Sequence, residues 1–405
     1  MNKSPDISCP RRRKMNLPLE GFLVLDLSQR LPGSLCTQIL ADLGAEVIKI
    51  ENPGGGDDFR GTPPIVKTIG SFFHVLNRNK RGMTLALKQP AGRDVFLKLA
   101  AKADVLLESF RPGWMKETGL GYEDLKTSNP RLVYCSLTGF GQDGPYRDRP
   151  AHDIDFLAVS GILSLIGEKS GRPVLPAVQF AGAGGGLGAA MGILAALLGR
   201  EKSGRGEYID MAILDGLTPF LGLVMSQYMT DGRLPERGDT LVGGGYAFYN
   251  VYETRDGKFI VLGCLEEKFW EVFCRAIHRE DLIGEQFAPA PRRHEIIEEL
   301  RAVFLEKTRE EWLEHLGRCE ICFSPVNSLE EALNDPQIEK RRLWFRGSHP
   351  TDGEIPQQTF PVKFSGDRPG WRSHPPELGE HTEDILRELG YSDREISELA
   401  ALGII

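Results

Sequence analysis

The feature that most constrains the fold is a strand–helix–strand pattern near the beginning of the chain. A short apolar run covers residues 23–27, and Pro32-Gly33 separates it from a helical spacing of apolar residues that continues to Leu43. A second apolar run follows at residues 46–50. Two strands joined by one helix over so short a distance are typical of a parallel βαβ unit.

The same pattern returns farther along the chain. Residues 104–108 and 132–136 form apolar runs, and helical segments at 92–101 and 122–128 precede them. Repeated alternation of strands and helices favours a doubly wound parallel sheet. We therefore expect an α/β fold with a Rossmann-like large domain.

The second half of the chain predicts a smaller α+β domain at residues 231–329. Long helices are expected at 187–200 and 207–229, before a break at Asp231-Gly232. Residues 248–254 and 258–262 predict a hairpin, because Asp256-Gly257 is a strong turn signal. Three helices are then expected, at residues 267–276, 292–307 and 309–317.

The segment after residue 329 is rich in Pro, Gly and charge and contains two short predicted helices, at 382–389 and 393–402. It cannot build a core of its own, so we expect it to pack back onto the large domain. That domain would then comprise residues 19–230 and 330–405. Residues 1–18 are expected to be a disordered leader without a signal peptide, with Met15 as an alternative start.

Composition narrows the class of protein. The chain has 405 residues, 41% of them apolar and 26% charged, which fits a soluble enzyme with more than one core. A net charge of −8 argues against a nucleic-acid partner. Seven cysteines without a secretory signal indicate reduced thiols and a cytoplasmic protein. The Gly- and Ala-rich run at 183–198 favours a buried helix over a membrane span.

Basic side chains suggest where an anionic ligand would bind. Arg78, Lys80, Arg81 and Arg111 are expected where strands end, at the edge where open α/β sheets hold their ligands. Contact with phosphate groups is one interpretation of these residues. A solvated basic loop is the other.

Many segments together resemble the class III CoA-transferases, of the formyl-CoA and carnitine CoA-transferase types, and the 2-methylacyl-CoA racemases. They cover nearly the whole chain from residue 19, in family order. The matching segments are Val24-Leu25-Asp26-Leu27-Ser28, Pro32-Gly33, residues 43–51 with Pro53-Gly54, Asn77-Arg78-Asn79-Lys80, Phe110-Arg111-Pro112-Gly113, residues 136–141, His152-Asp153, Gly204-Arg205-Gly206, Tyr252-Glu253-Thr254 with Asp256-Gly257, and Gly379-Glu380-His381-Thr382.

The resemblance implies a large domain that binds coenzyme A, a small domain, and a dimer of two chains interlinked like rings of a chain. Active sites in such dimers lie between the large domain of one subunit and the small domain of the other. Coenzyme A or acyl-CoA would be the substrate together with a carboxylic acid acceptor, and no metal and no membrane partner is expected. The residues implied in CoA binding are Gln29, Asn77, Arg78, Lys80, Arg111, Gly184 and Gly185.

Two basic positions of the family are absent from this chain. The residue after the second strand is typically Arg and is Asn52 here, and a second Arg is replaced by Glu117. The neighbouring Lys116 is in a position to compensate for the second loss. A carboxylate that faces a phosphate is repulsive, so the CoA site is expected to be rearranged or weak.

The resemblance also implies catalytic residues. His152-Asp153 matches a pair in which the histidine moves the α-proton of an acyl thioester, chemistry for which the pKa of imidazole is suited. Glu266 matches a glutamate that hydrogen-bonds this histidine. Read without the family, His152 would be a helix cap or core residue and Glu266 a helix N-terminal acid.

The decisive departure from the family is a missing acid. Family members place an aspartate shortly before a run of glycines, which falls at Ala181 or Gly182 here. That aspartate is the nucleophile of the transferases and the second acid/base of the racemases. The glycines are left to approach a thioester or donate N–H groups, or only to pack helices. Cys319 and Cys322 are read as structural because no second pair with ligand spacing exists.

Three functions follow. The first is a CoA-transferase subunit of a heteromeric enzyme of the benzylsuccinate CoA-transferase type, whose paralogous partner supplies the aspartate. The second is a homodimeric racemase or epimerase that uses His152, Asp153 and Glu266 at the α-carbon. The third is a non-catalytic scaffold subunit. Asp153, Asp155 and Glu266 remain candidates for a substitute nucleophile.

Overall fold

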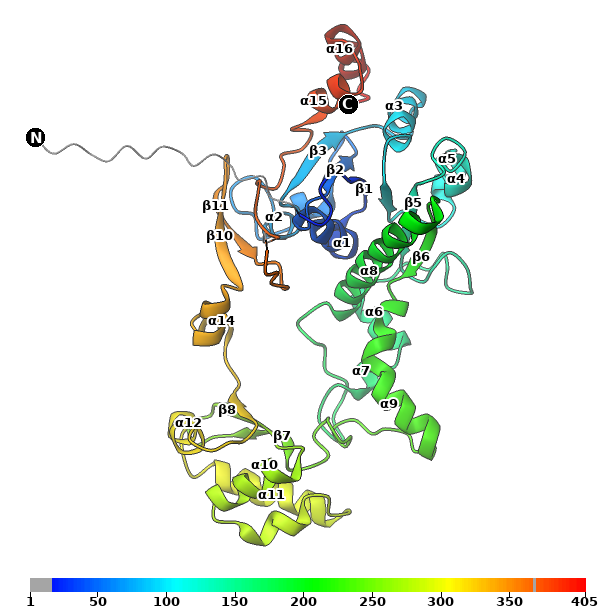
Figure 1. Cartoon of the computed structure of the whole chain (residues 1–405). Coiled ribbons are helices and arrows are strands. Elements are labelled where there is room, and N and C mark those ends of the chain that lie inside the picture. The colour runs from blue at the N-terminus through cyan, green and yellow to red at the C-terminus, as the bar shows by residue number, and fades with distance from the viewer. Residues whose placement is uncertain (1–16, 367–368) are drawn as a thin grey trace, which may run out of the picture. The chain divides into compact units, whose positions relative to one another are not determined.

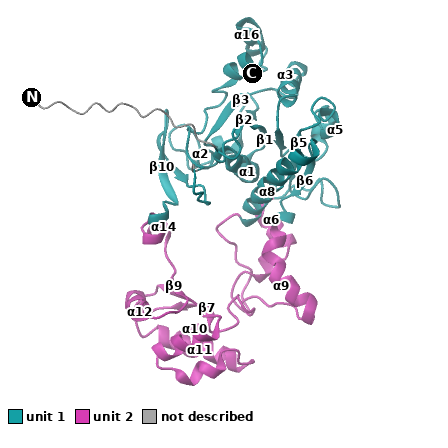
Figure 2. Cartoon of the chain, in the orientation of Figure 1, with its two compact units in different colours: residues 1–151, 180–216, 340–405 teal, residues 152–179, 217–339 magenta. Residues whose placement is uncertain are grey.

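The computed structural model describes residues 17–366 and 369–405. The chain divides into two compact units (Figure 2). Unit 1 comprises residues 1–151, 180–216 and 340–405, and unit 2 comprises residues 152–179 and 217–339. The basic leader expected before residue 17 lies outside the described residues.

Unit 1 is built on a six-stranded sheet in the order β3-β2-β1-β4-β5-β6 (Figure 1). All neighbouring strands in it are parallel. The order reverses between β1 and β4, so the helices that follow these two strands lead away in opposite directions. The strands are β1 (Leu23–Leu27), β2 (Glu46–Glu51), β3 (Lys80–Thr84), β4 (Val105–Glu108), β5 (Val133–Thr138) and β6 (Tyr208–Ala212). The expected α/β fold with a parallel sheet is confirmed.

Each face of the sheet carries its own apolar core, because successive strand residues point to opposite faces. Val24 and Val47 pack against α1 (Arg30–Asp42) and α8 (Phe180–Ser203) on one face. Leu25 and Ile48 pack on the other face, which α3 (Pro90–Ala100) covers. Shorter helices complete the unit: α2 (Ser71–Leu76), α4 (Trp114–Glu117) and α5 (Tyr122–Leu125).

The C-terminal segment completes the second face, as the sequence predicts. Ile385 of α15 (Thr382–Glu388) and Ile396 of α16 (Asp393–Ala401) are buried in the core with α3. The hydroxyl of Thr382 also accepts a hydrogen bond of 3.0 Å from the backbone N–H of Thr84. Before these helices the chain forms an antiparallel pair, β10 (Trp344–His349) and β11 (Gly353–Gln358), which the sequence did not predict.

Unit 2 has a three-stranded antiparallel sheet of β7 (Tyr249–Glu253), β8 (Phe259–Gly263) and β9 (Phe323–Pro325). The first two strands are the predicted hairpin. Aromatic residues of α10 (Glu267–Ala276), α11 (Arg292–Phe304) and α12 (Arg309–Leu316), among them Trp270 and Trp312, fill its core. The remaining helices are α6 (Asp153–Val159), α7 (Ile162–Leu165), α9 (Thr218–Asp231), α13 (Leu329–Leu333) and α14 (Pro336–Arg341).

Three expectations about local structure are wrong. Residues 207–229 are not one helix, because Tyr208–Ala212 pairs with β5 as strand β6 before α9 begins. Arg78, Lys80 and Arg81 do not follow a strand, because β3 begins at Lys80. Leu17, expected in the leader, is 8% exposed and packs beside Gly44.

The boundary between the units also differs from the expected domains. Residues 152–179 and 217–230, which the sequence places in the large domain, group with unit 2. The helix α9 has no buried residue that would fasten it to a core.

Candidate functional site

The strand order itself points to a binding site. Ligands of open α/β sheets bind outside the carboxyl ends of the strands, where the strand order reverses. That point lies between β1 and β4, whose ends continue into Gln29 and Ser109. The backbone N–H of Gln29 donates to the hydroxyl of Ser109 at 3.2 Å, so the two strand ends meet there. The side chain of Gln29 is exposed at this edge.

A tight turn after β1 shapes this point. Arg30 has a φ of 61°, and the ideal Cβ of an alanine at Gly33 would lie 2.1 Å from the Cβ of Ser28. Only glycine permits so close an approach. The hydroxyl of Ser28 donates in turn to Asp26 at 2.5 Å.

A network of buried charged side chains contacts the backbone of this turn. The Lys49 ammonium lies 3.0 Å from the Asp57 carboxylate and donates to the carbonyl of Ser28 at 2.9 Å. The same Asp57 carboxylate accepts from the backbone N–H of Arg30. Both turn contacts therefore depend on one buried pair.

Lys80 and Asp26 form a second pair in this network. Their charged atoms lie 3.1 Å apart, and both side chains are fully buried. Burial alone would raise the pKa of Asp26, but Lys80, Lys49 and two hydroxyl donors lower it to about 2. Burial lowers the pKa of Lys80 to about 8 against the attraction of Asp26. An incomplete network of this kind would be strongly destabilising.

Several residues predicted to contact CoA form hydrogen bonds and ion pairs with other side chains of the protein. Lys80 also donates to Asn77 at 2.8 Å, and Arg78 donates to the Asp42 carboxylate through two nitrogens at 2.9 and 2.5 Å. Contact of Arg78 or Lys80 with a phosphate would require these pairs to open. Arg111 differs, because its side chain is exposed in the loop after β4.

A row of polar side chains crosses the carboxyl ends of β4, β5 and β6. Glu108, Ser136 and Asp210 are neighbours in register on one face of the sheet. Burial raises the pKa of Glu108 to about 7, against a hydrogen bond from Ser136. Glu108 accepts from the N–H of Phe110 at 2.8 Å, and Asp210 accepts from the N–H of Gln142 at 3.0 Å. The two carboxylates thus anchor the loops that follow β4 and β5.

The expected acid is absent from the beginning of α8. Ala181 and Gly182 lie in the first turn of this helix, and both are buried. Farther along the helix, Gly185 is approached by Gly216, where an added Cβ would lie 2.6 Å from the backbone nitrogen of Gly185. A Cβ added to Gly186 of the helix would lie 2.5 Å from the carbonyl of Pro32. Close packing therefore accounts for small residues here, and ligand contact by Gly184 and Gly185 stays a prediction.

The predicted proton-transfer residues lie in unit 2, at helix beginnings. His152 precedes α6, where its backbone N–H donates to Asp155 at 2.9 Å, and its side chain is exposed. Asp153 is the first residue of that helix. Glu266 precedes α10 and is also exposed. His152 and Glu266 both lie in the described part of the chain, and no hydrogen bond or ion pair joins them there.

A family model described as CoA-transferase family III matches residues 19–382. The chain belongs to CoA-transferase family III. Family III relatives include the succinyl-CoA:glutarate CoA-transferase of Mus musculus, 35% identical over 96% of this chain and 90% of the relative. The alpha-methylacyl-CoA racemase of Homo sapiens is 36% identical over 96% of this chain and 98% of the relative.

Two further family III comparisons bear on assembly and fold. The chain is 34% identical to the succinyl-CoA–L-malate CoA-transferase beta subunit of Chloroflexus aurantiacus, over 96% of this chain and 98% of that one. The crystal structure of a CAIB/BAIF family protein from Brucella suis superposes with a TM-score of 0.81 at 32% identity. That match covers 93% of this chain and 100% of the Brucella chain.

In this family III chain α8 alone, among the described helices, is long and apolar enough to cross a membrane by length and composition. Its residues Ala189 and Ile193 pack in the core beside β1 and β5, as in a core helix. The described residues include no cluster of three His, Cys, Asp or Glu side chains that could hold a metal. The six described cysteines are free thiols, Cys319 and Cys322 among them.

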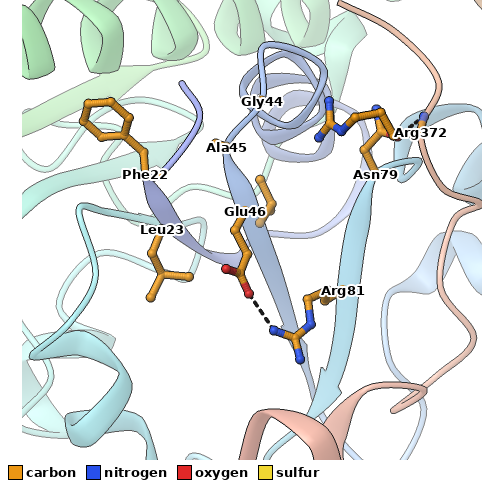
Figure 3. Close-up of a pocket in the computed structure, with 10 residues that line it drawn as sticks. Phe22, Leu23, Gly44, Ala45, Glu46, Asn79, Arg81 and Arg372 are labelled. Atoms are coloured by element: carbon orange, nitrogen blue, oxygen red, sulfur yellow. Dashed lines mark hydrogen bonds and ion pairs between the residues drawn. The ribbon is translucent and has the colours of Figure 1, made fainter. Parts of the chain in front are cut away.

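A small pocket of about 320 Å³ lies at the opposite, amino edge of the sheet (Figure 3). Its two arginines are held by protein groups. Arg81 pairs with Glu46 at 2.5 Å and with Glu388 at 2.8 Å. Arg372 donates to the carbonyl of Ala41, at the end of α1, at 2.6 Å. These contacts give the pocket a structural role.

The sequence reasoning overlooked Ser109, Glu108 and Arg147 at the carboxyl edge. Arg147 lies in the loop after β5, and its Nε is buried without a hydrogen-bond partner among the described residues. The signal that pointed to Arg111 was its position after a predicted strand. The same signal was present for Arg147, which follows the predicted strand at 132–136.

Proposed function

We propose that this family III chain transfers CoA between an acyl-CoA donor and a carboxylic acid as one subunit of a heteromeric enzyme. One observation carries the heteromeric part: the first turn of α8 presents Ala181 and Gly182 where the family places its aspartate. In the transfer that the family resemblance implies, a carboxylate oxygen attacks the thioester carbonyl, the C–S bond breaks, and CoA leaves as a thiolate. Neither alanine nor glycine has an atom that can attack.

The beginning of a helix is a suitable place for that acid. Backbone N–H groups of the first turn are unpaired within the helix, and the helix dipole stabilises a negative charge there. A paralogous chain with an aspartate at this position would supply the nucleophile, while this chain supplies the groups that surround it. The resemblance to the Chloroflexus beta subunit supports such an assembly.

The surface of the chain supports a protein partner. Met191 of α8 is 71% exposed, and Leu223 and Met229 of α9 are 83% and 79% exposed. Large apolar side chains that are exposed on a helix mark a surface that another chain covers. We infer that α8 and α9 contact the second subunit of an interlinked dimer.

Glu266 fits the same arrangement. It is exposed and makes no contact with His152 within the chain, as expected of a residue that completes a site in the other subunit. In the heteromer, Glu266 of this chain would face the histidine position of the partner, near the partner's aspartate. Gln29 and Arg111 would bind CoA in the large domain.

Co-expression tests the proposal. The chain is purified with a paralogue that carries the aspartate, and CoA transfer from succinyl-CoA to a panel of carboxylic acids is followed by chromatography of the acyl-CoA products. The complex is expected to be active, and Glu266→Gln in this chain is expected to reduce turnover at least ~10-fold. Unchanged turnover in Glu266→Gln and His152→Ala complexes would instead favour a scaffold role.

A racemase is the second candidate, because the chain is 36% identical to a human alpha-methylacyl-CoA racemase and retains His152, Asp153 and Glu266. His152 would remove the α-proton of a 2-methylacyl-CoA and return it to the opposite face. Incubation of the chain alone in deuterium oxide would then place deuterium at the α-carbon. No exchange across a panel of 2-methylacyl thioesters would exclude this function.

A further inference from the structure

The last residue of β5 and the loop that follows it contain three unpaired polar groups. Thr138 Oγ1, Gln142 Nε2 and Arg147 Nε are buried, and none has a hydrogen-bond partner among the described residues. Thr138 is only 6% exposed. Buried polar groups are nearly always paired, so these three groups are open to a bond with water or with a ligand.

Arg147 is the cation in this group. Its Nη2 lies 3.1 Å from the position that a Cβ on Gly113 would occupy. Gly113 has a φ of 94° and stands two residues after Arg111, in a turn closed by a 3.1 Å hydrogen bond from the N–H of Trp114 to the carbonyl of Arg111. The loops after β4 and β5 therefore bring Arg111 and Arg147 to the same turn.

No carboxylate among the described residues forms an ion pair with either arginine. The ion pairs of the described residues include neither Arg111 nor Arg147, although Glu117 Oε1 lies 3.8 Å from the Cβ position of Gly113. Glu117 is exposed and can turn toward solvent. At the amino edge, by contrast, Arg81 is fully paired with two carboxylates.

We propose that Arg147, together with Arg111, binds a phosphate group of coenzyme A at the carboxyl edge of the sheet. A guanidinium offers planar, paired N–H donors that match phosphate oxygens. Arg147 in this way supplies a cation beside Glu117, where the family resemblance implies an arginine. The inference rests on the proposed function, because it takes an acyl-CoA as the ligand.

Calorimetric titration of the full-length chain tests this contact. Coenzyme A, 3′-dephospho-CoA and pantetheine are titrated into the wild type, Arg147→Gln and Arg147→Lys. We expect Arg147→Gln to weaken CoA binding about 10- to 100-fold, and Arg147→Lys to weaken it less, because lysine keeps the charge but loses the paired donors. Arg131→Gln is the matched control, since Arg131 is an exposed arginine at the amino end of β5 that pairs with Glu201.

The ligands identify which phosphate is bound. If Arg147 contacts the 3′-phosphate, dephospho-CoA binds the wild type and Arg147→Gln equally. If it contacts the diphosphate, both nucleotides lose the same factor, and pantetheine is unaffected in either case. Equal CoA affinity of wild type and Arg147→Gln, or an equal loss with pantetheine, would overturn the inference alone. A wild type that does not bind CoA would contradict the proposed function itself.

Should Arg147→Gln fail to fold by circular dichroism, Arg147→Lys decides the question, because it keeps the charge and most of the side-chain volume. A CoA affinity in Arg147→Lys equal to that of the wild type would then count against the phosphate contact.

Discussion

The two edges of the parallel sheet in unit 1 treat their charges differently. At the amino edge, Arg81 and Glu46 are paired with each other at partly exposed positions. Toward the carboxyl end of β1, Asp26 is paired with the side chain of Lys80, which reaches it from the beginning of β3, and both side chains are fully buried. Arg111 and Arg147, in the loops after β4 and β5, have no carboxylate partner among the described residues. The arginine at the amino edge is neutralised by carboxylates of the protein. The two arginines in the loops at the carboxyl edge are not paired with any described carboxylate. The difference supports the proposal that the carboxyl edge is the side that binds a ligand.

The largest expected effect concerns the buried pair. Asp26→Ala leaves Lys80 and Lys49 with one carboxylate fewer in a site without solvent, and should lower the free energy of unfolding by about 3–5 kcal/mol. Urea unfolding followed by circular dichroism measures this change. A loss below about 1 kcal/mol would show that the two edges do not differ in the way described.

The next effect is a dependence of stability on pH. Burial raises the pKa of Glu108 from 4.5 to about 7. Between these values the unfolded chain releases this proton while the folded chain keeps it, so the contribution of Glu108 to stability falls as pH rises. This pKa shift lowers the free energy of unfolding by about 3 kcal/mol, and the full loss is reached above pH 7.

Glu108→Gln removes this dependence while keeping the shape of the side chain. The difference in unfolding free energy between wild type and variant is expected to be constant below about pH 4.5, to favour the variant increasingly up to about pH 7, and to level off above it. A difference that does not vary with pH would show that Glu108 titrates normally.

A smaller effect is expected at the turn after β1. Gly33→Ala places a Cβ about 2.1 Å from that of buried Ser28, so the turn must shift, at a cost of about 1–3 kcal/mol. Gly199→Ala is the matched control, because a Cβ there meets nothing within 4 Å and the residue lies inside α8, four residues before its last residue, Ser203. That control should stabilise the chain by about 0.5–1 kcal/mol. Equal stability of both variants would argue against a constrained turn.

The smallest effect belongs to the amino edge. Glu46→Ala removes a carboxylate that is 48% exposed from Arg81, which keeps Glu388 as a partner. Exposed pairs contribute about 0–1 kcal/mol, and the variant should unfold within that range of the wild type. A loss comparable to that of Asp26→Ala would erase the contrast between the edges.

Local sequence patterns correctly predicted the strands whose residues are apolar and buried, and the hairpin with a strong turn signal. The apolar runs of β1, β2, β4 and β5 and the Asp256-Gly257 hairpin lie where expected. Strand β3 was missed because its sequence, Lys-Arg-Gly-Met-Thr, is polar. Its lysine is buried only because Asp26, 54 residues earlier, neutralises it. Strand β6 was missed because Tyr208–Ala212 joins the apolar residues of α9 into one apparently continuous pattern.

Some residues of the candidate site were proposed from the sequence, and their roles stay predictions. Position after a strand pointed to Arg111, and the family resemblance pointed to Gln29 and to the missing acid at Ala181 or Gly182. Arg147 also follows a predicted strand, but that position alone does not distinguish it from its charged neighbours. Its buried, unpaired nitrogen and its approach to Gly113 depend on how two loops fold against each other. The role of Glu108 depends on burial, which a single carboxylate in an apolar strand does not reveal.

The rate of CoA transfer by the purified chain alone tests whether this chain needs an aspartate from a partner. Succinyl-CoA and a saturating panel of carboxylic acids are the substrates, and the same chain co-purified with a paralogue that carries the aspartate is the reference. We expect no transfer above background by the chain alone and clear transfer by the complex. Robust transfer by the chain alone would show that another group replaces the acid missing from α8.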